Sequence, residues 1–217
     1  MPFPVGKITQ ELNDERDAQK EIELAAMQDT VFLPDPPAIR AALHRLTQKS
    51  GKLDIAVAFI GADWWSLLSN FSGKTRVVCW LSSVNTNPYA VEDMLRRANV
   101  QTRQHDSMHA KVYFAPRVGA IVGSANLSKA ALNELDTAGQ CEAGVLIRDR
   151  KALSAIDSWF QELWTSASTS EIARSELTAA KRAWNQARMA RPHIGNGPRR
   201  SRLIQIGLVT RLGSSNG

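Results

Sequence analysis

Short apolar runs alternate with amphipathic segments along the middle of the chain, and this alternation limits the possible folds more than any other feature. Residues 53–60, 75–81 and 141–147 are typical of buried strands. Residues 88–98 and 151–164 carry apolar side chains at helical spacing. Strands that alternate with helices predict an α/β domain with a mixed β-sheet flanked by helices on both faces.

A β-hairpin is predicted in the centre of this pattern. Its strands are residues 110–115 and 120–122, which are rich in Val, Tyr, Phe and Ile. His109 and Lys111 are two positions apart at the start of the first strand, so their side chains share one face. The second strand runs into Gly123, Ser124 and Asn126. A hairpin brings its first and last residues together, so these polar groups are expected to meet at one end.

The four side chains suit phosphodiester chemistry. An imidazole can attack phosphorus or transfer a proton, and the ammonium and carboxamide can bind the phosphoryl oxygens. A lone histidine on a strand is more often structural than catalytic. We interpret His109 as catalytic because Lys111, Ser124 and Asn126 are in register with it.

The spacing of these residues resembles the HKD motif of the phospholipase D superfamily, H-x-K-x4-D-x6-G-S-x-N. From His109 to Asn126 this chain reads H-A-K-V-Y-F-A-P-R-V-G-A-I-V-G-S-A-N. The one departure is Pro116, where the family usually has Asp. In the family this Asp supports the fold around the site more than it touches substrate, so the exchange bears on local rigidity more than on chemistry.

The resemblance implies a site built from two facing copies of the motif. This chain has one copy and no internal repeat, so the resemblance implies a homodimer that shares one site. One His109 would form a phosphohistidine and the other would act as general acid and then base. Lys111, Asn126 and Gly123 would bind phosphate with help from Ser124, without a metal or another cofactor. Glu142 would be the carboxylate that orients the nucleophilic imidazole, since relatives often have an acidic residue there.

Positive charge is concentrated at the C-terminal end. Residues 171–217 contain nine Lys or Arg and two Glu, a net charge of +7, whereas the whole chain carries +6, which leaves −1 for residues 1–170. Such a block is typical of a nucleic-acid contact, although a solvated tail has the same composition. The candidate nucleic-acid-binding residues are Lys181, Arg182, Arg188, Arg199, Arg200 and Arg202.

Three regions are predicted: a helical arm at 1–33, a phospholipase D-like catalytic domain at 34–168, and a C-terminal helix with a basic tail at 169–217. No apolar run is long enough for a membrane span, and the first residues lack the apolar core of a signal peptide. Cys79 and Cys141 lie in apolar runs, so both are predicted to be buried thiols in a reducing cytoplasm.

These features together predict a metal-independent, cytoplasmic phosphodiesterase, most specifically an endonuclease that cleaves DNA or RNA. It would act as a homodimer, without a membrane, alone or in a larger defence or repair complex. Two alternatives stay open. The chain could be a nucleic-acid-binding or assembly subunit with a vestigial site, or a phospholipid hydrolase whose tail binds anionic lipid.

Overall fold

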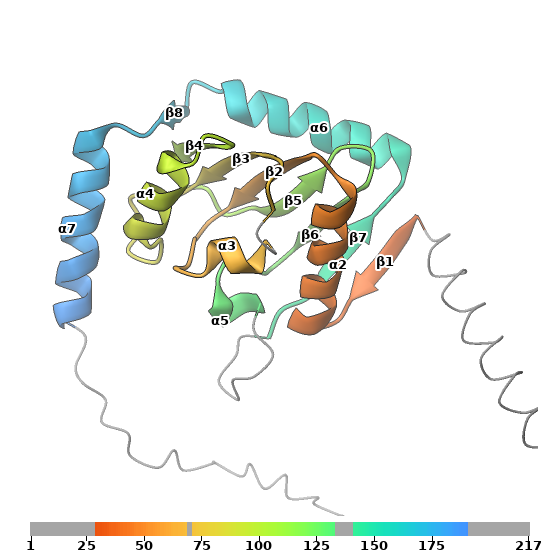
Figure 1. Cartoon of the computed structure of the whole chain (residues 1–217), viewed down its shortest axis with the longest axis horizontal. Helices are drawn as coiled ribbons and strands as arrows, with labels where there is room; N and C mark the ends of the chain where they lie inside the picture. The colour runs from red at the N-terminus through yellow and green to blue at the C-terminus, as the bar shows by residue number, and fades with distance from the viewer. Residues whose placement is uncertain (1–28, 69–70, 133–140, 191–217) are drawn as a thin grey trace, which may run out of the picture.

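The computed structural model describes residues 29–68, 71–132 and 141–190, which form an α/β fold around one sheet (Figure 1). The strands are β1 (Thr30–Leu33), β2 (Lys52–Val57), β3 (Lys74–Cys79), β4 (Val100–His105), β5 (Lys111–Ala115), β6 (Gly119–Gly123), β7 (Gly144–Ile147) and β8 (Thr169–Glu171). The helices are α2 (Pro36–Lys49), α3 (Trp64–Leu67), α4 (Pro88–Arg96), α5 (Lys129–Leu132), α6 (Arg150–Thr165) and α7 (Arg174–Ala190).

The sheet is mixed, in the order β1-β7-β6-β5-β2-β3-β4-β8. β2, β3 and β4 run parallel, and every other pairing between neighbours is antiparallel. β5 and β6 form the predicted hairpin at the centre of the sheet, with Val112 opposite Val122. The predicted mixed sheet is therefore confirmed.

Helices pack on both faces of the sheet, as predicted. α6 covers one face and buries Phe160 against Phe114 and Val78 of the strands. α2, α3, α4 and α5 lie across the opposite face, where Leu43 of α2 joins the main core, and α7 packs beside α4. Alternate residues of each strand serve the two layers, which is why the central strands are apolar along their whole length.

The three longer helices of the sheet domain begin at side-chain caps that the sequence carries. Asp35, Asn87 and Asp149 each accept a hydrogen bond from a backbone N–H in the first turn of α2, α4 and α6, at 2.8, 3.0 and 2.8 Å. Pro36 and Pro88 occupy the first helical positions, where a missing N–H costs nothing. These caps fix where each helix leaves its preceding strand.

Two short edge strands were not predicted. Residues 30–33, which the sequence analysis assigned to the helical arm, form β1 and pair with β7. Residues 169–171, assigned to the start of the C-terminal region, form β8 and pair with β4 before α7 begins. Strands of three or four residues are too short for a period-2 pattern to be recognised, so only the tertiary pairing defines them. Residues 1–28 and 191–217 lie outside the described residues.

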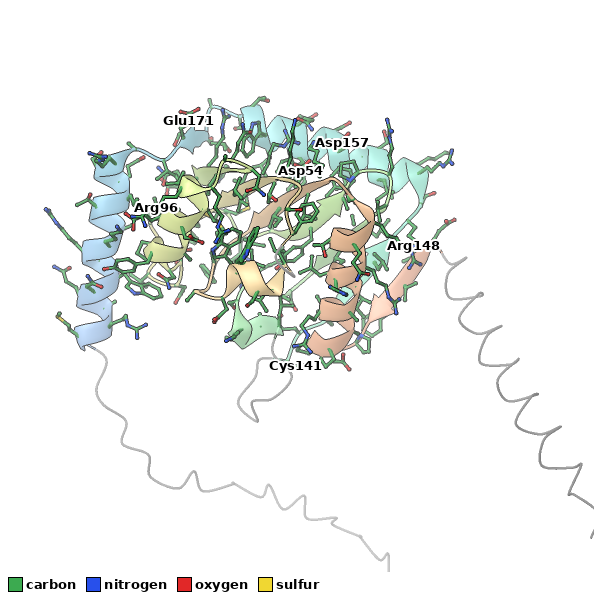
Figure 2. All side chains as sticks on the ribbon, viewed as in Figure 1. Asp54, Arg96, Cys141, Arg148, Asp157 and Glu171 are labelled. Atoms are coloured by element: carbon green, nitrogen blue, oxygen red, sulfur yellow. The ribbon has the colours of Figure 1, made fainter. Side chains whose placement is uncertain are left out.

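The prediction for the two cysteines was half right. Cys79 is completely buried on β3, as expected. Cys141 is exposed at the rim of the molecule (Figure 2), because β7 begins at Gly144 and not at residue 141. Among the described residues, no helix has the length and apolarity that a membrane crossing requires.

Candidate active site

The sequence-predicted site residues gather at one edge of the sheet. Val57, at the end of β2, is opposite Lys111, at the start of β5. Gly123, at the end of β6, is opposite Gly144, at the start of β7. Because β5 begins where β2 and β6 end, the loops next to these strands meet at this edge.

His109 and Lys111 come together as the two-residue spacing predicts. The Lys111 Nζ donates to the carbonyl oxygen of His109 at 2.7 Å and lies 3.2 Å from Nδ1 and 3.3 Å from Nε2 of the imidazole. Lys111 is 9 % exposed, whereas His109 lies open to solvent. The imidazole ring is therefore accessible to a substrate, and the ammonium group of Lys111 lies on its buried side.

A tight turn delivers His109 from β4. The Met108 N–H donates to the carbonyl of His105 at 3.2 Å, and Ser107 adopts a positive φ of 75°. Strained backbone of this kind is maintained only where the surroundings fix it. Here Ser82, in the loop after β3, donates to Asp106 of the turn at 2.9 Å, and this bond holds the segment that positions the imidazole.

Asn126 is fixed by a partner that the sequence analysis did not identify. Its Oδ1 accepts a hydrogen bond from the backbone N–H of Phe59 at 3.0 Å. The Phe59 ring meets the His109 ring edge-on, with 6.5 Å between centroids. The amide oxygen of Asn126 is thus engaged, which turns its NH₂ group toward other acceptors. The sequence contained one indication of this contact, because Phe59 lies near the end of a predicted central strand and so at the same sheet edge as the site.

Glu142 contacts Ser124 and not His109. The Ser124 hydroxyl donates to Oε2 of Glu142, and the backbone N–H of Ala143 donates to the same Ser124 oxygen at 3.1 Å. Glu142 is only 5 % exposed, so its carboxylate needs such a partner. The expected contact with the imidazole is replaced by one with the hydroxyl, because Glu142 lies before β7, which pairs with β6 and not with β5.

The packing of β6 against β7 explains why residue 123 is a glycine, a reason that the sequence analysis did not consider. A Cβ at this position would lie 2.5 Å from the carbonyl oxygen of Ala143 and 2.8 Å from the Cα of Gly144. The close approach that requires glycine is therefore that of the neighbouring strand. A backbone contact with phosphate at this residue stays a prediction.

Pro116 lies far from the site. It follows the last residue of β5, at the opposite end of the hairpin from His109, and the four residue steps from Lys111 to Ala115 span about 13 Å. The Val118 N–H donates to the carbonyl of Ala115 at 3.0 Å, and Arg117 has a φ of 65°. Proline followed by a residue of positive φ is the pattern of a type II turn. The departure from the family motif therefore lies in the hairpin turn, away from the catalytic residues.

The electrostatics of the site centre on Lys111. Burial lowers the pKa of Lys111 below the ordinary lysine value, and the nearby carboxylate of Glu142 opposes this effect. Burial, followed by the same carboxylate, raises the pKa of Tyr113, whose hydroxyl donates to the Ala125 carbonyl at 3.1 Å. Within the described ranges, no cluster of three or more His, Cys, Asp or Glu is arranged to hold a metal ion.

The predicted nucleic-acid-binding residues divide into three groups. Lys181 forms an ion pair with Glu92 at 2.7 Å, so it fastens α7 to α4. Arg182 and Arg188 are exposed on α7, and the Arg188 guanidinium stacks on Trp184. Arg199, Arg200 and Arg202 lie outside the described residues.

The family model described as "Cardiolipin synthase, PLD-like domain" matches residues 16–164, more than half of the chain. The chain belongs to the phospholipase D superfamily. The match contains the whole motif from His109 to Asn126. No curated protein sequence matches the chain significantly.

Solved structures share the fold. NucT from Helicobacter pylori has 18% identity and a TM-score of 0.51 over 66% of this chain and 98% of its own. Nuc from Salmonella typhimurium, a phospholipase D family member, has 18% identity and a TM-score of 0.51 over 66% of this chain and 95% of its own. Phosphatidylserine synthase from Haemophilus influenzae has 8% identity and a TM-score of 0.57 over 74% of this chain and 42% of its own. At these identities the likeness concerns the fold of this superfamily member.

Proposed function

We propose that this phospholipase D-like protein is a metal-independent endonuclease that cleaves phosphodiester bonds through a phosphohistidine. The observation that carries the proposal is the exposed imidazole of His109 backed by the Lys111 ammonium, beside the hydroxyl of Ser124 and the amide of Asn126. The basic segment at residues 171–217 favours a nucleic acid over a lipid as substrate.

The reaction would proceed in two displacements. A neutral His109 imidazole attacks phosphorus, a P–N bond forms, and the P–O bond to the leaving group breaks. The leaving oxygen takes a proton from a second imidazole. That imidazole then removes a proton from water, which attacks phosphorus, breaks the P–N bond and releases the phosphate product. Lys111 and Asn126 would neutralise and bind the phosphoryl oxygens, whose negative charge grows in each transition state.

The second imidazole would be His109 of the partner subunit. One chain carries one motif, and its His109 is open to solvent at the sheet edge. A two-fold axis beside this edge would place two identical half-sites face to face. Ser124, held by the buried Glu142, would keep the end of β6 in place next to the phosphate.

Cleavage of plasmid and single-stranded DNA in EDTA tests this function. Wild type is expected to cut and His109→Ala to lose cleavage, whereas His44→Ala on the outer face of α2 is the matched control and is expected to cut normally. Cleavage that requires added metal, or that His109→Ala retains, would contradict the mechanism. Hydrolysis of phospholipid vesicles without DNA cleavage would assign the site to a lipid.

Mixing experiments test the shared site. When wild type and His109→Ala are unfolded together and refolded, each mixed dimer would contain one imidazole and be inactive. Activity should then fall with the square of the wild-type fraction. A linear fall would mean that each chain has a complete site of its own.

A further inference from the structure

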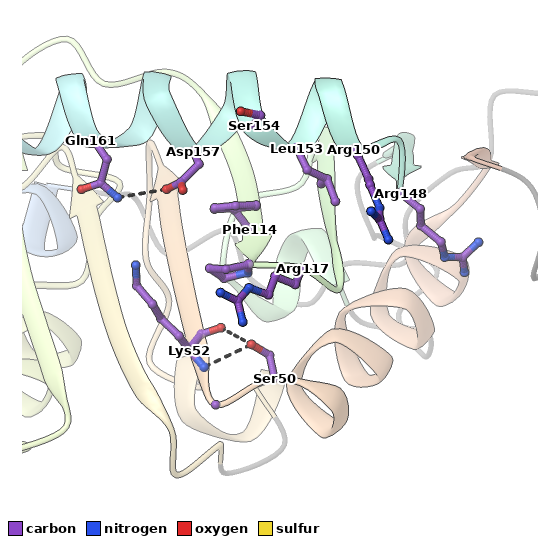
Figure 3. A pocket seen from close by; sticks show the side chains of 12 residues that line it. Ser50, Lys52, Phe114, Arg117, Arg148, Arg150, Leu153, Ser154, Asp157 and Gln161 are labelled. Carbon is purple, nitrogen blue, oxygen red and sulfur yellow. Dashed lines mark hydrogen bonds between the residues drawn. The ribbon is translucent and has the colours of Figure 1, made fainter.

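A second feature of the fold, a basic pocket, lies at the sheet edge opposite the catalytic residues. Its volume is about 910 Å³, within the usual range for small-molecule sites. It opens between α6, the start of β2 and the turn of the β5–β6 hairpin (Figure 3). The lining residues are Ser50, Gly51, Lys52, Phe114, Pro116, Arg117, Arg148, Arg150, Leu153, Ser154, Asp157 and Gln161.

Positive charge dominates this basic pocket. Four of its lining residues are Lys or Arg and one, Asp157, is acidic. The Asp157 carboxylate accepts a hydrogen bond from Gln161 at 3.0 Å. Among the residues that the structure describes, the guanidinium groups of Arg117 and Arg150 have no hydrogen-bond or ion-pair partner. Lys52, by contrast, forms an ion pair with Asp54 at 3.0 Å. Two guanidinium groups without partners, at one hollow, indicate an anionic ligand.

The backbone supports the same conclusion. Arg117 occupies the turn at a φ of 65°, a conformation that glycine or asparagine adopts more readily. In Figure 3 the Arg117 side chain extends below α6, toward the space that Arg150 also borders. The type II turn that begins at Ala115 sets this conformation and places Arg117 at the lining of the pocket. Phe114, buried in the middle of the lining, gives the pocket an apolar floor.

We propose that the basic pocket is a binding site for a phosphate-bearing ligand of nucleotide size, separate from the catalytic site. Arg117 and Arg150 bind the phosphate, since a guanidinium matches phosphate oxygens with two parallel hydrogen bonds. Ser154 supplies a hydroxyl group, whereas the Ser50 hydroxyl is engaged by the backbone of Lys52. The Leu153 side chain, which packs with the buried Phe114 ring, faces the apolar part of the ligand. The site does not depend on the proposed nuclease activity.

Backbone amide NMR titration of the full chain tests the site, with pyrophosphate, adenosine diphosphate and a short single-stranded oligonucleotide as probes. We expect the amides of residues 115, 117, 118 and 148–154 to shift on binding. Arg117→Gln/Arg150→Gln should weaken these shifts by about tenfold or more, as the loss of charge-assisted contacts implies. Arg96→Gln/Arg174→Gln removes the same charge from exposed positions on α4 and α7 and should change nothing.

The probes distinguish the sources of the phosphate. Binding of pyrophosphate or the nucleotide alone assigns the site to a free small molecule, and equal binding of the oligonucleotide assigns it to a strand. Shifts confined to residues 109–111 and 123–126, or shifts that survive in Arg117→Gln/Arg150→Gln, would overturn the proposal. If that variant does not fold, Arg150→Gln alone, at an exposed helix start, gives the same decision.

Discussion

Gly123→Ala separates a structural role for this glycine from a role in binding phosphate. The added Cβ would meet two backbone atoms of the segment entering β7, the Ala143 oxygen at 2.5 Å and the Gly144 Cα at 2.8 Å. Backbone cannot rotate away as a side chain does, so β6 and β7 must move apart. Overpacking of this kind lowers the free energy of unfolding by about 1–3 kcal/mol, which corresponds to roughly 2–12 °C in Tm.

Thermal and urea unfolding measure this effect, and Gly51→Ala is the matched control. A Cβ on Gly51 would have no atom within 4 Å. That variant should keep its stability or gain about 0.4–1 kcal/mol from a less flexible unfolded chain. The reasoning is refuted if Gly123→Ala unfolds like wild type. An unchanged Tm combined with weaker phosphate binding would mean that the glycine serves the ligand.

Three further outcomes are expected. Asp54→Asn should cost about 3–5 kcal/mol in urea unfolding, because the carboxylate is fully buried in an ion pair. Asp93→Asn should cost under about 1 kcal/mol, because Asp93 is half-exposed and an asparagine oxygen can still accept from Trp64. Burial raises the pKa of Cys79 to about 12, so a thiol reagent should modify Cys141 alone in the native protein and both thiols in denaturant. Because burial lowers the pKa of Lys111 below the ordinary lysine value of 10.5, Lys111 should lose its proton, and phosphate binding should weaken, before the pH reaches 10.5. Calorimetry across alkaline pH measures this affinity, and an affinity that is undiminished up to pH 10.5 would contradict the prediction.

The sequence predicts the central part of the molecule well because its signals there are redundant. The run from 110 to 122 has both strand composition and motif spacing, and it forms the hairpin of β5 and β6. The edges were harder to predict. β1 and β8 have four and three residues, so their existence depends on the pairing partners β7 and β4.

The candidate site was predicted as a set of residues but not as a set of contacts. Alternation along a strand places His109 beside Lys111, and the structure has them together. The partner of Glu142 depends on which strand lies next to β6, and periodicity does not contain that information. The contact of Asn126 with Phe59 joins residues 67 positions apart, so it follows only from the completed sheet.

The β5–β6 hairpin also fixes the distance between the two ends of the motif. Val112 faces Val122 and Ala115 faces Gly119, so the separation between His109 and Asn126 is set by two strands of equal length and one tight turn. An extra residue inside either strand would turn every later side chain to the other face, whereas an exchange in the turn alters neither count nor direction. Searches for related chains should therefore hold the spacing fixed and let the identity of residue 116 vary.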